Sequence, residues 1–157
     1  MTASARDGMP DDAVNLHGSG IVLGDRGVLI LGPSGTGKSQ LALALVNRWH
    51  LAGRHARFVA DDQLFAVARH GRLLMLAPHA IAGLAEAWFY GPAGVRHEPA
   101  AVVDLVVEIG QPDPPRFQQG VTTRIAGVEL ACIALPDQAG QTAIMAVAGA
   151  LSAPPFV

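Results

Sequence analysis

Short apolar runs separated by turn-forming pairs alternate along the chain with two stretches of helical periodicity. Apolar runs on either side of Gly-Asp, His-Gly or Ala-Gly pairs are typical of β-hairpins. The predicted hairpins join 18–24 to 26–32, 63–69 to 72–76, and 122–125 to 128–135. Further strands are predicted at 57–60 and 100–109, and the nearly unbroken β-branched run of 100–109 predicts a central strand.

Leu41, Leu45 and Trp49 recur at helical spacing and predict a helix over 38–51 that is closed by Gly53. A last helix is predicted within 138–151, whereas frequent Gly and Pro predict an irregular segment over 78–99. Together these elements indicate an α/β fold, with a mixed sheet and flanking helices on at least one face. The expected organisation is a flexible segment 1–14, one domain 15–152, and a tail 153–157.

Composition narrows the class of protein. A length of 157 residues fits one domain, and a hydrophobic content of 50% is enough for a sizeable core. A net charge of -2 gives no electrostatic case for a nucleic-acid partner. No leader-like start and no apolar run of membrane-spanning length is found, so we expect a cytoplasmic protein without membrane contact. Cys132, the single cysteine, lies in an apolar run and is predicted to be a buried structural thiol.

The stretch "GPSGTGKS" at 32–39 follows the apolar run "GVLIL" and matches the G-x-x-x-x-G-K-[ST] pattern of phosphate-binding loops. Glycines let backbone N–H groups surround phosphates, and the helix N-terminus adds unpaired donors. Lys38 is the sole lysine among eleven basic residues, at a place where the planar fork of arginine fits poorly. A glycine-rich turn can match by chance, but the flanking strand and helix favour nucleotide binding. The predicted nucleotide-binding residues are Gly32, Pro33, Ser34, Gly35, Thr36, Gly37, Lys38 and Ser39, and the Ser39 hydroxyl also suits Mg²⁺.

A phosphate-binding loop needs a carboxylate for the metal and for the incoming nucleophile. Asp61 and Asp62 end the apolar run "RFVADD", where a strand returning beside the loop would bring them near the phosphates. The two carboxylates can divide the roles of base and metal ligand; the alternative is a solvated turn. Asp104, inside the run "VVDLVV", is a rival that reads more easily as a paired core acid. The six histidines show no zinc-like spacing.

Three segments in order, "LHGSGIVLGDRGVLILGPSGTGKSQLALALV", "RFVADD" and "PHAIAGLAE", resemble the catalytic domain of the HPr kinase/phosphorylase family. The later "PPRFQQGVTTRIAGVELACIALP" is similar to the end of its short, single-domain form, so that the resemblance covers about residues 16–152. It implies a phosphate-binding-loop fold like those of HPr kinase and phosphoenolpyruvate carboxykinase. It also implies a kinase that uses ATP and Mg²⁺ to phosphorylate a serine of HPr, the phosphocarrier of the sugar phosphotransferase system, and in many members reverses the reaction by phosphorolysis.

The resemblance also implies roles for individual residues. Asp61 is expected to take the serine proton and to return it in the reverse direction, and His17 is expected to touch the reacting phosphate. Asp62 and Ser39 are expected at the metal, with Glu86 as a second metal-side acid.

One departure from the family pattern bears on function. The family signature Glu-x-Arg-Gly-x-Gly aligns with "EAWFYG", in which Glu86 and Gly91 match, but Trp88 replaces the arginine and Phe89 the glycine. That arginine would lie near the transferred phosphoryl group, and Arg96 is the nearby candidate to substitute for it. The loss favours an alternative function, a nucleotide-binding regulatory module with weak or no catalysis. A small-molecule kinase is a third reading, but no arginine-rich lid segment is evident. The sequence leaves room for a homo-oligomer.

Overall fold

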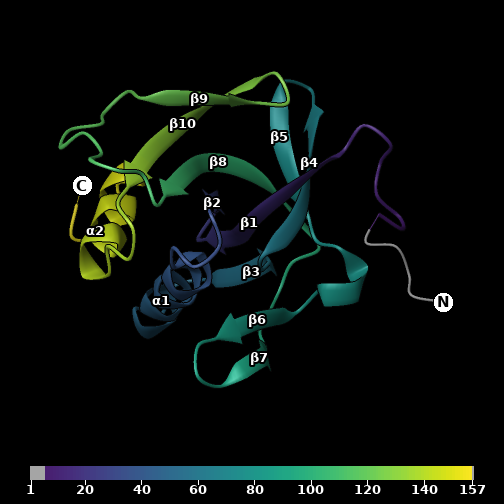
Figure 1. Ribbon diagram of the computed structural model, residues 1–157, viewed down its shortest axis with the longest axis horizontal. Coiled ribbons are helices and arrows are strands. Elements are labelled where there is room, and N and C mark those ends of the chain that lie inside the picture. The colour runs from purple at the N-terminus through teal and green to yellow at the C-terminus, as the bar shows by residue number, and fades with distance from the viewer. Residues whose placement is uncertain (1–5, 157) are drawn as a thin grey trace.

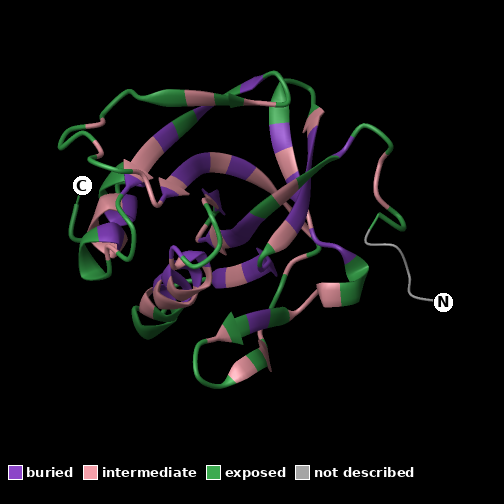
Figure 2. Ribbon diagram, viewed as in Figure 1, coloured by how far each residue is buried: buried purple, intermediate pink, exposed green. Residues whose placement is uncertain are grey.

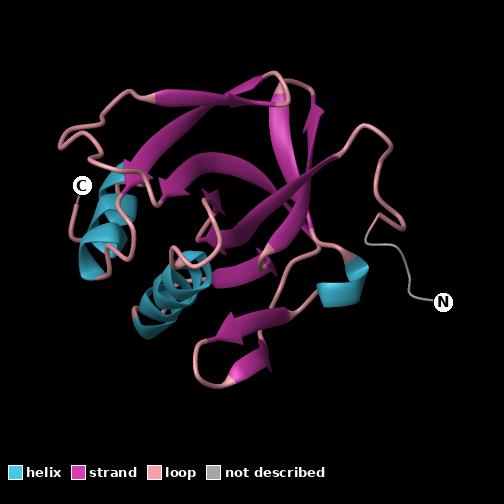
Figure 3. Cartoon of the chain, viewed as in Figure 1, coloured by secondary structure: helices cyan, strands magenta, loops and turns pink. Residues whose placement is uncertain are grey.

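The computed structural model describes residues 6–156 as a strongly curved β-sheet with two α-helices beside it (Figures 1 and 3). The elements in chain order are β1 (Val14–Leu23), β2 (Arg26–Leu31), α1 (Lys38–Leu51), β3 (Ala56–Ala60), β4 (Gln63–Arg69), β5 (Arg72–Leu76), the 3₁₀ turn η1 (His79–Ile81), β6 (Leu84–Ala87), β7 (Gly91–Gly94), β8 (Ala100–Ile109), β9 (Thr122–Ile125), β10 (Val128–Leu135) and α2 (Gln141–Ala150).

Eight of the strands form one mixed sheet in the order β2-β1-β4-β5-β8-β10-β9, with β3 also paired to β1. The sheet curls back on itself because β2 pairs with β8 as well as with β1. β8 is the central strand: it runs parallel to β2 and β10, and its first residues pair antiparallel with β5. β6 and β7 form a separate two-stranded hairpin that lies beside α1 (Figure 1).

Alternate residues of β2 and β8 face two different cores, and both strands are accordingly largely buried and mostly apolar (Figure 2). Ile30 and Val107 pack into the core between the sheet and the two helices. Leu29 and Val106 pack into a second core enclosed by the curved sheet, together with Met75. The strand that leads into the glycine-rich loop 32–37 is therefore fixed from both sides.

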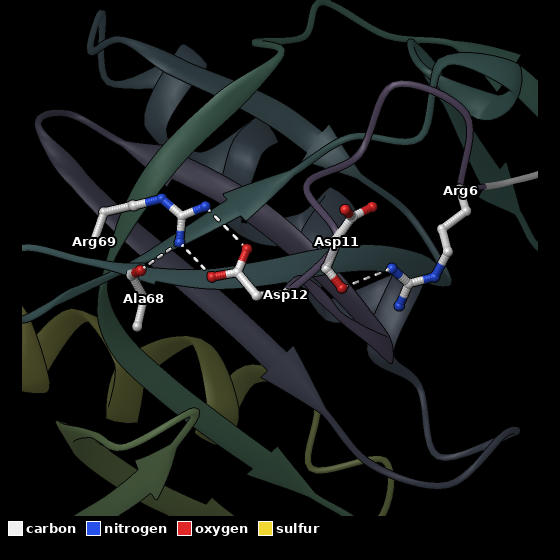
Figure 4. Close-up of polar contacts among 5 residues, drawn as sticks. All are labelled: Arg6, Asp11, Asp12, Ala68 and Arg69. Carbon is white, nitrogen blue, oxygen red and sulfur yellow. Dashed lines mark hydrogen bonds and ion pairs between the residues drawn. The ribbon is translucent and has the colours of Figure 1, made fainter.

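Arg69 ties the segment before β1 to the sheet, and Arg6 makes hydrogen bonds within that segment (Figure 4). Arg69 of β4 makes two hydrogen bonds to the Asp12 carboxylate, of 2.7 and 3.0 Å. The Arg69 guanidinium lowers the pKa of Asp12 below its ordinary value, chiefly through these hydrogen bonds. Arg6 donates to the carbonyl oxygens of Asp11 and Ala13 at 3.4 and 2.7 Å. Residues 1–5 of the predicted flexible segment 1–14 and residue 157 of the predicted tail lie outside the described residues, and the proposed domain limits stay a prediction.

The structure confirms the three predicted hairpins, the α1 helix and the central position of the strand at 100–109. The prediction of an irregular segment over 78–99 was wrong, because this segment contains η1 and the β6–β7 hairpin. β7 has the sequence Gly-Pro-Ala-Gly, which carries no β-propensity signal. α2 begins at Gln141, three residues later than predicted. Among residues 6–156, no helix is long and apolar enough to cross a membrane.

Candidate functional site

The glycine-rich loop 32–37 connects β2 to α1, and its glycines are required by its geometry. A Cβ on Gly32 would lie 2.3 Å from the carbonyl oxygen of Ile109 at the end of β8, so no larger residue fits there. Gly37, the residue before α1, has a φ of 98°, a conformation that side chains with a Cβ rarely adopt. No described side chain caps α1, so its first backbone N–H groups and its positive dipole end remain available to an anion.

Lys38 begins α1, and its ammonium group turns back over the loop. Its Nζ donates hydrogen bonds to the carbonyl oxygens of Gly32 at 2.7 Å and Pro33 at 3.0 Å, and the residue is only 7% exposed. Thr36 also donates to the Pro33 carbonyl oxygen, at 2.7 Å. The loop is therefore closed around a single buried positive charge.

Asp61, which follows β3, joins three elements through one carboxylate. Its Oδ1 accepts hydrogen bonds from the hydroxyls of Ser39 in α1 and Ser19 in β1, at 2.8 and 2.7 Å. Its Oδ2 accepts from the backbone N–H of Glu86 in β6 at 2.8 Å. Asp61 is 7% exposed and is the negative charge in direct contact with the end of the glycine-rich loop.

The other residues predicted for the site, His17, Asp62 and Glu86, are exposed to solvent. Asp62 is exposed, has a φ of 68°, and accepts a hydrogen bond from the Gly18 backbone N–H through its carbonyl oxygen at 3.1 Å. His17, next to Gly18, is exposed and pairs in register with Gln63. Glu86 is exposed, and the contact with Asp61 comes from its backbone. The structure thus brings His17, Asp61, Asp62 and Glu86 together around the loop, but it joins Ser39 to Asp61 rather than to Asp62.

Residues 6–156 contain no cluster of three or more His, Cys, Asp or Glu side chains arranged to hold a metal ion. Mg²⁺ in phosphoryl-transfer sites is usually held by one or two protein oxygens, with substrate phosphates and water completing its six ligands. The Ser39 hydroxyl and the Asp61 carboxylate, 2.8 Å apart beside the loop, are oxygen donors of this kind. The chemistry of the pair therefore fits Mg²⁺ brought in with a nucleotide.

Asp104 has the structural role expected of a paired acid. It accepts a hydrogen bond from the Gly27 backbone N–H at 2.8 Å and forms ion pairs with Arg26 and Arg72 at 3.9 and 3.6 Å. These contacts lie at the start of β2, at the opposite end of that strand from the glycine-rich loop. Asp104 is therefore remote from the site.

Arg96 and Trp88 line different clefts. The exposed Arg96 side chain lines a cleft with Arg54 and Arg57, along α1 from Leu43 onward and away from the first turn. Trp88, by contrast, lies near the first turn of α1, in a cavity to which Gly37 and Gln40 also contribute.

Sequence reasoning missed Ser19 and Gln40. Ser19 is fully buried in an apolar strand, and a polar residue at an inward position was the signal that could have identified it. Gln40 gave no such signal, because one amide in the first turn of a helix is ordinary. Cys132 is buried as predicted, and burial, together with the nearby Glu108 carboxylate, raises the pKa of its thiol to about 11, so it is no nucleophile at neutral pH.

Comparisons with known proteins agree on one family. The family model described as HPr Serine kinase C-terminal domain matches residues 11–152. The chain is 34% identical over 139 residues to an HPr kinase/phosphorylase of Chlorobium phaeobacteroides (strain BS1), covering 80% of this chain and 39% of that protein. It is 31% identical over 142 residues to an HPr kinase/phosphorylase of Limosilactobacillus reuteri (strain DSM 20016). That match covers 81% of this chain and 42% of the relative.

The chain therefore spans about two fifths of the length of these curated relatives. Among solved structures, the Hpr(Ser) kinase/phosphatase from Coxiella burnetii matches with a TM-score of 0.69 at 23% identity. That match covers 85% of this chain and 91% of the other. The mixed α/β fold is therefore similar to that of the solved Hpr(Ser) kinase/phosphatase.

Proposed function

The chain belongs to the HPr serine kinase C-terminal domain family, and on that premise we propose that it is an ATP- and Mg²⁺-dependent serine kinase acting on an HPr-like phosphocarrier protein. The hydrogen bond between Ser39 and Asp61 carries the proposal, because it couples the end of a phosphate-binding loop to a buried acid. In phosphate-binding-loop enzymes, Mg²⁺ is held by such a hydroxyl and an acid at the end of a nearby strand.

We assign phosphate binding to the glycine-rich loop and to Lys38. The N–H groups of the loop and of the first turn of α1 supply donors, and Lys38 supplies a compact charge that can exchange its carbonyl partners for phosphate oxygens. Ser39 and Asp61 would hold Mg²⁺, which neutralises phosphate charge when bound, and Glu86 lies beside them as a further acid. The N–H groups, Lys38 and the bound metal would stabilise charge on the transferring phosphoryl group, whereas the carboxylates would act only by holding the metal.

We assign the roles of the two aspartates differently from the expectation drawn from the resemblance. Asp61 is buried and accepts three hydrogen bonds, so an incoming serine cannot easily reach it. Asp62 is exposed next to it and suits the base. Asp62 would take the proton of the substrate serine while the serine oxygen bonds to the γ-phosphorus and the bond to the β-phosphate oxygen breaks, which releases ADP. His17, on the neighbouring strand, would contact the transferred phosphoryl group.

The alternative function, a nucleotide-binding module with weak catalysis, is favoured by a single observation. Trp88 lies beside the first turn of α1, where the family resemblance expects an arginine, and Arg96 lies elsewhere. A tryptophan offers no positive charge to the transition state. Both functions require ATP binding, and they differ in turnover.

One assay separates the two functions. Purified protein is incubated with ATP, Mg²⁺ and HPr, and phosphoserine on HPr is measured by mass spectrometry, with an HPr variant lacking the acceptor serine as the control. Phosphorylation of HPr but not of the control supports the kinase. Tight Mg-ATP binding without phosphorylation supports the module, and absence of ATP binding contradicts both.

A further inference from the structure

A cavity of about 320 Å³ lies beside the glycine-rich loop, and the predicted phosphate site does not account for it. Its lining is mainly apolar and comes from the first turns of α1, the end of β8, the β6–β7 hairpin and the start of α2. Gly37, Gln40, Leu41, Trp88, Ile109 and Ile144 are among the lining residues. Because Gly37 belongs both to the loop and to this lining, the cavity opens directly beside the place proposed for the phosphates.

Gln40 gives this cavity a polar feature. Its amide nitrogen is buried and has no hydrogen-bond partner among residues 6–156. A buried amide without a partner is destabilising, and native structures usually satisfy such groups. A ligand with a hydrogen-bond acceptor would remove this penalty.

Trp88 forms an aromatic wall of the cavity. It is 43% exposed, although a tryptophan that only filled a core would be covered. Flat aromatic side chains that line a small apolar site suit the face of a heterocyclic ring, since stacking on an aromatic residue is a general way to bind a base.

We propose that this cavity binds the base of the nucleotide whose phosphates occupy the glycine-rich loop, with Trp88 stacking on the base and Gln40 hydrogen-bonding to its edge. A glutamine amide can donate from Nε2 and accept at Oε1 side by side, which matches the N7 and N6–H₂ groups of adenine, whereas guanine presents two acceptors on that edge. The cavity therefore selects ATP over GTP. This inference rests on the proposed nucleotide binding and adds a base site to it.

The test compares ATP, GTP and inorganic tripolyphosphate, each with Mg²⁺, by titration calorimetry. The unmodified protein should bind ATP more tightly than GTP, and GTP more tightly than tripolyphosphate, which has no base. Trp88→Ala should weaken ATP binding on the order of tenfold and leave tripolyphosphate binding unchanged. Tyr90→Ala is the matched control, because Tyr90 is a neighbouring exposed aromatic that does not line the cavity, and it should change neither affinity.

Gln40→Leu supplies a second readout that a purely structural role would not give. Removal of the unpaired amide should raise the melting temperature of the free protein, while ATP binding weakens and the preference over GTP is lost. If ATP and tripolyphosphate bind equally and Trp88→Ala changes neither, the base site is wrong and the proposed kinase still stands. If no phosphate compound binds to the unmodified protein, it is the proposed function that fails.

Discussion

The glycine-rich loop and the turn between β6 and β7 differ in how tightly the structure fixes their residues. Asp61 connects the elements next to them, because it accepts hydrogen bonds from Ser39 in α1 and from the Glu86 backbone in β6. In the loop, Gly32 has no room for a Cβ, and Lys38 is buried between carbonyl oxygens. In the turn, Phe89 and Tyr90 are 107% and 82% exposed. The loop cannot change without loss of its shape, whereas the turn can exchange side chains at little cost to the fold.

This difference explains how the chain keeps the family's loop pattern and departs from its turn signature. Phe89 occupies the signature's first glycine position with a φ of 67°. A glycine adopts this conformation without strain, whereas phenylalanine does so at a cost. We therefore expect binding functions, which depend on the loop, to be better preserved than catalytic functions that depend on the turn.

The largest effect is expected in the loop. Lys38→Ala should abolish or strongly weaken Mg-ATP binding, because the charge at the centre of the loop is lost. Lys38→Arg should also be impaired, since a planar guanidinium does not fit the buried place between the Gly32 and Pro33 carbonyl oxygens. Calorimetric titration with Mg-ATP measures both, and thermal melts check that the variants are folded. Unchanged ATP affinity in Lys38→Ala would contradict the phosphate-binding assignment.

The second prediction distinguishes the roles of Asp61 and Asp62. Asp62→Asn should lower phosphate transfer to HPr by about 10²–10⁴-fold, as expected for a general base, with Mg-ATP binding largely intact. Asp61→Asn should instead raise the Mg²⁺ concentration needed for nucleotide binding, because it alters the partner of Ser39. Transfer rates at saturating ATP and Mg²⁺ titrations distinguish the two. Loss of transfer with normal Mg²⁺ dependence in Asp61→Asn would return the role of base to Asp61.

A smaller gain is expected when the turn is given back the family signature. An arginine over a transferring phosphoryl group can contribute about 10³–10⁵ in rate, and the double variant Trp88→Arg with Phe89→Gly should recover part of this, at least about tenfold. ATP affinity should fall in the same variant, because the proposed stacking partner is removed. Phosphorolysis should gain most, since it must hold inorganic phosphate as an additional anion. Phe89→Gly alone is the control. If the unmodified protein already transfers and removes phosphate at ordinary rates, the departure is harmless.

The sequence predicted the loop but not the β6–β7 hairpin, because only the loop has a local sequence signal. The hairpins and α1 were predictable because alternation, helical spacing and turn pairs are local signals, and the loop pattern is local too. The β6–β7 hairpin was not, because Gly-Pro-Ala-Gly forms a strand only through its pairing with 84–87. The contact of Asp61 with Ser19, Ser39 and Glu86 joins residues that are far apart in the chain, so no spacing rule reveals it. The sequence located both aspartates but could not show which one is buried.

The smallest effect is expected for the Arg96→Ala variant. This variant tests whether Arg96 substitutes for the family arginine that Trp88 replaces. Arg96 follows the β6–β7 hairpin, but its side chain lies with Arg54 and Arg57 along α1 from Leu43 onward, whereas Lys38 and Ser39 do not line that cleft. Arg96→Ala should therefore leave Mg-ATP affinity and phosphate transfer unchanged, because a positive charge must lie over the reacting oxygens to stabilise them. Steady-state transfer to HPr beside Arg54→Ala, a matched change in the same cleft, provides the measurement. A collapse of transfer in Arg96→Ala alone would show that this arginine moves to the loop during the reaction and supplies the charge that Trp88 cannot.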